Sequence, residues 1–182
     1  HVTGVQTCAL PISVHPSLLF HGTTIDNAEQ ILNTNTLKPG DGYYNEGAVS
    51  MTRDLGVAVN AASWQDPAGV VFVLDPSVIA RRNRIEPFDW EGGTPEYEER
   101  TFEPIRKINR AIKQIIVIMQ DGVRLGDLRE EYPSVMWDYR TVVKKQDKIS
   151  IYSTYRQFTK GRVKKRHQIS YTPQLDRKST RL

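Results

Sequence analysis

The run Gly69-Val70-Val71-Phe72-Val73-Leu74-Asp75 constrains the fold more than any other stretch of the chain. It is rich in β-branched and aromatic residues and has no polar side chain before Asp75, which is typical of a buried strand. Residues 115–119 form a second apolar run of this kind. A chain with such runs needs other elements to cover them, so the sequence predicts a packed core built on a sheet.

Shorter extended and helical patterns lie between these two runs. We expect further strands at residues 18–20, 48–51, 100–105 and 149–152, and helical segments that begin at Asp26 and cover 56–64, 108–115 and 122–131. Asp26, with an acidic residue three positions on, resembles a helix N-cap. Short helices inserted between strands predict an α+β domain.

Length and composition fit one soluble domain. The chain has 182 residues, enough to bury a sizeable core. No window approaches the roughly 18 apolar residues of a membrane span, and no secretory signal pattern is present. We therefore expect a cytoplasmic protein.

The two ends differ from the rest of the chain. Residues 1–12 and 176–182 resemble translated sequencing-adapter read-through of the kind found on some metagenomic gene predictions, and we exclude them from functional reasoning. Cys8, the only cysteine, lies in the first of these segments. The expected domain covers residues 13–158, and a basic tail follows at 159–175. The net charge of +4 comes from the C-terminal segments, because residues 1–158 sum to −3.

A polar cluster follows the first apolar strand. Leu18-Leu19-Phe20 leads directly into His21-Gly22-Thr23. An apolar strand that ends in small polar residues suggests a strand that delivers them to a cleft. His21 could donate to a ligand hydroxyl, and a flat ring could lie against Gly22, which has no Cβ.

Two later segments complete a set of polar groups. Ser50 and Thr52 alternate along an expected strand, so both hydroxyls face one side. Glu98 and Glu99 precede the expected strand at 100–105.

The order His21-Gly22-Thr23, then Ser50 and Thr52, then Glu99 resembles the ADP-ribosyltransferase superfamily. The similarity is to its diphtheria-toxin-like and poly(ADP-ribose) polymerase-like branch and covers residues 17–119. It implies two packed, mainly antiparallel sheets with short helices around an NAD cleft. It also implies transfer of ADP-ribose from NAD to a protein or nucleic-acid acceptor, with release of nicotinamide and without a metal. The catalytic acid falls on Glu99, with Glu98 as the second candidate.

The chain departs from that branch at one position. Ser50 stands where a tyrosine would stack on the nicotinamide, and it resembles the serine of the cholera-toxin-like branch. Stacking would then come from Tyr43 or Tyr44. Arg53 is a candidate for the NAD diphosphate, because its guanidinium suits phosphate geometry. Residues 89–95, which include Trp90, are the expected acceptor loop.

Other functions remain open. An RNA 2′-phosphotransferase also carries His-Gly-Thr, but residues 13–20 lack the arginine expected before it. An NAD glycohydrolase or a non-catalytic module that binds ADP-ribose or nucleic acid fits the same residues. No dinucleotide fingerprint, metal-ligand spacing or Gly-x-Ser-x-Gly elbow occurs.

The same residues also have purely structural interpretations. His21 could cap a turn, and Gly22 could permit a tight one. The segment Thr52-Arg53-Asp54 could begin a helix. The acidic cluster at 96–99 could pair with Arg100 or Arg106.

Overall fold

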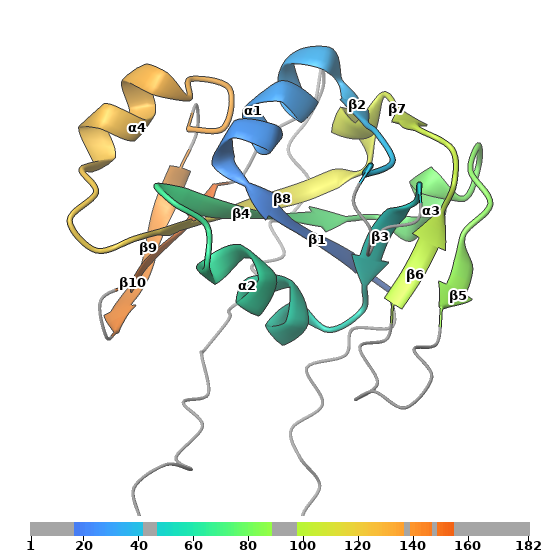
Figure 1. The fold of residues 1–182 in the computed structure, drawn as a ribbon, viewed down its shortest axis with the longest axis horizontal. Coiled ribbons are helices and arrows are strands. Elements are labelled where there is room, and N and C mark those ends of the chain that lie inside the picture. Colours follow the sequence, from blue (N-terminus) through green and yellow to red (C-terminus); the bar gives the residue numbers. More distant parts are fainter. Residues whose placement is uncertain (1–16, 42–46, 89–97, 137–138, 147–148, 155–182) are drawn as a thin grey trace, which may run out of the picture.

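The computed structural model describes residues 17–41, 47–88, 98–136, 139–146 and 149–154 (Figure 1). The elements in chain order are β1 (Leu19–Thr24), α1 (Ile25–Thr34), β2 (Thr36–Leu37), β3 (Val49–Thr52), α2 (Leu55–Ser63), β4 (Ala68–Leu74), α3 (Pro76–Ile79), β5 (Glu86–Phe88), β6 (Glu98–Thr101), β7 (Ile105–Arg106), the 3₁₀-helix η1 (Ile108–Arg110), β8 (Ile112–Met119), α4 (Leu125–Glu131), β9 (Tyr139–Gln146) and β10 (Ile149–Thr154). The predicted α+β class is confirmed.

The described strands form one large sheet and one small ribbon. Eight strands are hydrogen-bonded in the order β5-β6-β3-β1-β4-β8-β10-β9, and β2 pairs with β7 separately. All of these pairings are antiparallel. The predicted antiparallel pairing is confirmed for the described residues, where hydrogen bonding runs continuously from β5 to β9 and β2 and β7 form a second, smaller sheet.

The large sheet is weakly joined at one point. β1 pairs with β4 over six registers, from Leu19↔Leu74 to Thr24↔Gly69. Its pairing with β3 is limited to Phe20↔Thr52. Beyond that contact the two strands diverge and form a fork that opens away from Phe20.

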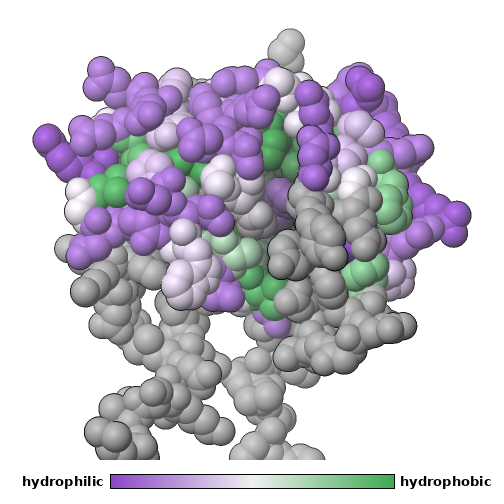
Figure 2. Space-filling view, in the orientation of Figure 1, coloured by the Kyte–Doolittle hydropathy of each residue, from purple (hydrophilic) through white to green (hydrophobic). Residues whose placement is uncertain are grey.

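Helices cover both faces of the central strands. Side chains of β4 alternate: Val70, Phe72 and Leu74 belong to a core with α1 and α4, whereas Val71 and Val73 belong to a core with α2. Figure 1 shows α1 and α2 on opposite sides of β1 and β4. Cover on both faces explains why the 69–74 run has no alternation of polar residues. The outer surface in this view is mostly hydrophilic (Figure 2).

The ends of several helices and strands differ from those that the sequence predicts. The cap of α1 is Thr24, whose hydroxyl accepts from Asn27 N, so the prediction of Asp26 is wrong by two residues. The prediction that Thr52-Arg53-Asp54 could begin a helix is confirmed, because Asp54 caps α2 through Gly56 N and Val57 N.

The expected helix at 108–115 is a short 3₁₀-helix followed by β8, which begins at Ile112. Tertiary pairing overrides local pattern here, because β8 pairs with β4 from Leu74↔Ile112 to Ala68↔Met119. The sequence interpretation missed β2, β5 and β9.

Candidate functional site

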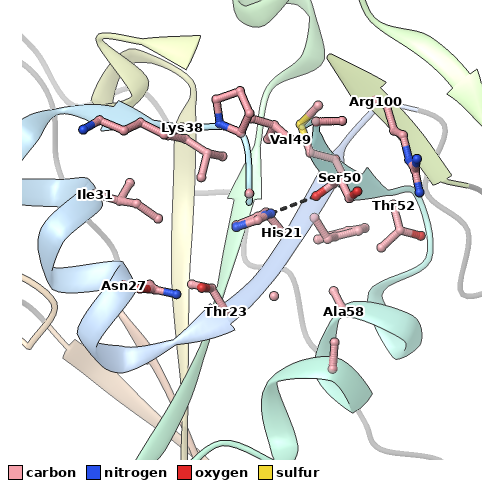
Figure 3. Close-up of a pocket in the computed structure, with 18 of the residues that line it drawn as sticks. His21, Thr23, Asn27, Ile31, Lys38, Val49, Ser50, Thr52, Ala58 and Arg100 are labelled. Carbon is pink, nitrogen blue, oxygen red and sulfur yellow. Dashed lines mark hydrogen bonds between the residues drawn. The ribbon is translucent and has the colours of Figure 1, made fainter. Parts of the chain in front are cut away.

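The fork between β1 and β3 holds a cleft of about 590 Å³. Its walls come from β1, α1, β2, β3, α2 and β6, and Figure 3 shows His21 near the centre, with Ser50 and Thr52 on one side and α1 on the other. A volume of several hundred Å³ is typical of small-molecule sites. The sequence-predicted residues that line it are His21, Gly22, Thr23, Ser50, Thr52 and Glu98.

His21 spans the fork. Its Nδ1 lies 2.8 Å from the backbone oxygen of Ser50. A carbonyl oxygen has no proton to give, so Nδ1 carries the hydrogen and donates it. Burial lowers the pKa of His21 below 6.5, outweighing the opposing effect of this hydrogen bond. The ring is therefore neutral near pH 7, and its Nε2 is an acceptor. The expectation that His21 donates to a ligand hydroxyl is corrected: it can accept from one.

This burial predicts a pH dependence of stability. Below pH 6.5 the unfolded chain binds a proton at this histidine that the folded chain takes up only at lower pH. The free energy of unfolding should therefore fall as the pH drops through that value, by up to about 1.4 kcal/mol per pH unit, until the folded ring also titrates. Denaturant unfolding at several pH values, with His21→Gln beside the wild type, measures it. Identical pH slopes for the two proteins would contradict this account of His21.

Ser50 lines the cleft and, within the described residues, has a buried hydroxyl without a hydrogen-bond partner. Leaving a buried polar atom unsatisfied costs about 1–3 kcal/mol, so this atom suits a ligand that supplies the missing bond. Thr52 differs, because its Oγ1 accepts from the backbone N–H of Asp54 at 2.9 Å, next to the start of α2.

The strand β6 brings a buried ion pair to the same wall. Register pairs Thr52↔Glu98 and Ser50↔Arg100 place these four side chains on one face of β3 and β6. Arg100 Nε donates to Glu98 Oε1 at 2.7 Å, and both side chains are buried. The Arg100 guanidinium also lies 3.4 Å from the centre of the Phe88 ring. The interpretation of Glu98 as a partner of Arg100 is therefore confirmed, and Glu98 also lines the cleft.

Glu99 lies on the opposite face of β6. Successive residues of a strand point to opposite sides. Glu99 forms a bidentate ion pair with Arg53, through Nε to Oε1 and Nη2 to Oε2, the latter at 3.2 Å. Neither Arg53 nor Glu99 is among the residues that line the cleft. The structure thus corrects the placement of both: of the two glutamates, Glu98 lines the cleft and Glu99 does not, and Arg53 is held by Glu99. Asp41 is a second carboxylate among the described residues that line the cleft.

Gly22 has a packing role. A Cβ added there would lie 2.5 Å from the backbone oxygen of Ala58, so the absence of a side chain lets α2 approach β1. Tyr43, Tyr44 and Trp90 fall outside the described residues, and so do the expected acceptor loop and the basic tail.

The sequence interpretation missed several residues that line the cleft. Asn27, Gln30 and Thr34 come from α1, Lys38 from the segment after β2, and Arg100 from β6. The signal for the first three was present, because their spacing puts them on one side of a helix that starts directly after His21-Gly22-Thr23.

Comparisons with known proteins found no match: no family model, no curated protein and no solved structure matches this chain. In the part of the chain that the structure describes, no group of three or more potential ligands could hold a metal ion. No helix among the same residues has the length and apolar character needed to cross a membrane.

Proposed function

We propose that this chain is an ADP-ribosyltransferase that cleaves the nicotinamide–ribose bond of NAD and transfers ADP-ribose to a macromolecular acceptor. One observation carries the proposal: residues that offer a hydroxyl acceptor, an unpartnered hydroxyl and a carboxylate line one cleft in the fork between β1 and β3. They are His21 Nε2, Ser50 Oγ and Glu98. His21 and Ser50 keep the order on which the resemblance to this superfamily rests, and Glu98, the second candidate for its acid, stands in place of Glu99.

The carboxylate suits the charge that develops in this reaction. When the C–N bond to nicotinamide breaks, its electron pair leaves with the ring nitrogen and the ribose gains oxocarbenium character. A fixed carboxylate close to the sugar stabilises that positive charge. Glu98 is 8% exposed and is held by Arg100, so it is positioned before the substrate arrives. The acceptor nucleophile then bonds to the anomeric carbon and loses its proton.

His21 and Ser50 suit the polar groups of the substrate. The neutral His21 ring offers an acceptor to a ribose hydroxyl, and the Ser50 hydroxyl can both donate and accept. Orienting groups of this kind align the sugar for bond cleavage without taking part in proton transfer. The polar residues of α1 that line the cleft add further hydrogen-bonding groups on the opposite wall.

Ser50→Ala tests this assignment of the cleft. With NAD that carries a label in its adenylate part, we expect the wild type to release nicotinamide and move the label to an acceptor. The variant should need about five- to tenfold more NAD for half-maximal rate, since it loses one hydrogen bond worth about 1 kcal/mol. Its stability should stay equal or rise, because an unsatisfied buried atom is removed. An unchanged NAD dependence would remove Ser50 from the site.

The same assay, together with ADP-ribose binding and an RNA substrate that carries a 2′-phosphate, distinguishes the other functions from the proposed one. Release of nicotinamide without labelled acceptor would indicate an NAD glycohydrolase. Binding of ADP-ribose without release would indicate a non-catalytic module. Removal of a 2′-phosphate from RNA with concomitant NAD consumption would indicate the phosphotransferase. Each of these outcomes would replace the proposed transfer reaction.

A further inference from the structure

Five of the exposed cations that the structure describes outside the cleft lie in or next to α3, β7 and η1. They are Arg81 and Arg82 after α3, Arg106 in β7, Lys107 just after it and Arg110 in η1. Within the described residues none of them takes part in an ion pair, in contrast to Arg84, which pairs with Glu86, and Lys113, which pairs with Asp75. We call these five residues the basic surface.

Buried amide contacts hold the parts of the basic surface together. The side-chain nitrogen of Asn83, directly after Arg82, donates to the backbone oxygens of Glu103 and Pro104, both at 3.3 Å. The turn that carries Arg81 and Arg82 is thereby fastened to the segment that leads into Arg106. Figure 1 shows α3 and β7 at the same end of the molecule.

The basic surface continues to the edge of the cleft. Arg106 pairs with Thr36 in the β2–β7 ribbon, and Thr36 lines the cleft. Two residues on, the exposed Lys38 lines it as well. A polymer bound along the basic surface would therefore reach the opening where ADP-ribose is proposed to be transferred.

The net charge of the domain does not account for the five cations of the basic surface. Residues 1–158 carry a net charge of −3, yet the segment 105–120 contains four basic residues and no acidic one. Glu103 is an exposed acid at its border. The cations are thus gathered at one place in an otherwise acidic domain, which is the electrostatic pattern of a surface that meets a polyanion.

We infer that the basic surface binds single-stranded nucleic acid and that this is the acceptor of the proposed reaction. Four of the five cations are arginines, whose planar guanidinium matches phosphate geometry. Phe102, four residues before Arg106, is 57% exposed, an unusual position for a large aromatic ring and a suitable one for stacking on a base. The inference rests on the proposed function for the transfer step, and on charge and exposure for binding.

Substitution of four arginines by glutamine tests the inference. The variant changes Arg81, Arg82, Arg106 and Arg110 in the full chain, and binding of a fluorescent oligothymidylate is followed by anisotropy over a series of salt concentrations. Loss of four phosphate contacts should weaken binding about a hundredfold at roughly 0.1 M salt and lower the salt slope by about 3. Phe102→Ala should weaken binding about tenfold with the slope unchanged.

A control variant tests whether the loss of oligonucleotide binding is specific to the basic surface. Arg124→Gln with Arg129→Gln removes one exposed cation just before α4 and one within it, at the other end of the fold, and should leave binding within twofold. The basic tail is present in every variant, so its contribution is constant.

Two results would overturn the inference. Equal binding by the four-arginine variant and the wild type would do so, and so would displacement of the oligonucleotide by polyglutamate of matched charge, which would assign the surface to an acidic protein. Nicotinamide release measured in the same samples separates the two proposals. Release without oligonucleotide binding rejects only the acceptor, whereas binding without release rejects the transferase.

Discussion

Glu98→Gln should lower the rate of nicotinamide release from NAD by about a hundred- to a thousandfold. The substitution keeps the size of the side chain and removes the negative charge that faces the cleft. Glu98 is buried and joined to Arg100, whereas Asp41, the other carboxylate among the described residues that line the cleft, is exposed, so we expect it not to replace Glu98. The effect should fall on kcat more than on KM, since the charge it stabilises exists only in the transition state.

Glu99→Gln is the matched control for this result. It makes the same chemical change one residue along β6, on the opposite face of that strand, where the side chain pairs with Arg53 and does not line the cleft. We expect nicotinamide release within a few-fold of the wild type, and a loss of about 1 kcal/mol in unfolding free energy from the partly exposed pair with Arg53. If Glu99→Gln abolished release and Glu98→Gln did not, the assignment of the two faces of β6 would be reversed.

Gly69→Ala should destabilise the protein by about 3 kcal/mol. A Cβ at this position would lie 1.8 Å from the backbone oxygen of Ala62 and 2.5 Å from its carbonyl carbon. Both are backbone atoms of α2, so no side-chain rotation can relieve the clash. The helix would have to move off β4, which would loosen its packing on Val71 and Val73. Denaturant unfolding of the wild type and the variant measures the loss.

Gly126→Ala provides the opposite case. This glycine lies in α4 with nothing within 4 Å of an added Cβ. Alanine there should raise stability by roughly 0.5–1 kcal/mol, because glycine loses more conformational freedom in a helix. Equal stability of the two alanine variants would contradict the close approach of α2 to β4.

The sequence pattern predicted the helices and strands that depend on residues close together in the chain. The run at 69–74 is a buried strand because both of its faces are covered, and the segment at 56–64 is a helix that Asp54 caps. Ser50 and Thr52 could be placed at the cleft because they alternate along β3. His21 also lines the cleft, but it lies inside β1, which runs to Thr24, and not after the end of a strand as predicted. Polar side chains at such positions have few other buried places in which their hydrogen bonds could be satisfied.

The remainder depends on contacts between distant segments. Which glutamate faces the cleft is fixed by the register Thr52↔Glu98 between β3 and β6, and a shift of one residue would exchange the two. The fork exists because β1 and β3 are paired at one position alone, Phe20↔Thr52, in the described residues. Pairing also converts Ile112 from an expected helical residue into the first residue of a strand. No local pattern encodes these partners.

The most direct test of the central claim is nicotinamide release from NAD by the full chain, with single-stranded oligonucleotide and a cell lysate present as acceptors. The account predicts release that matches the loss of NAD and that disappears in Glu98→Gln while it persists in Glu99→Gln. A sample that unfolds cooperatively on heating, and is therefore folded, yet releases no nicotinamide with any acceptor would contradict it.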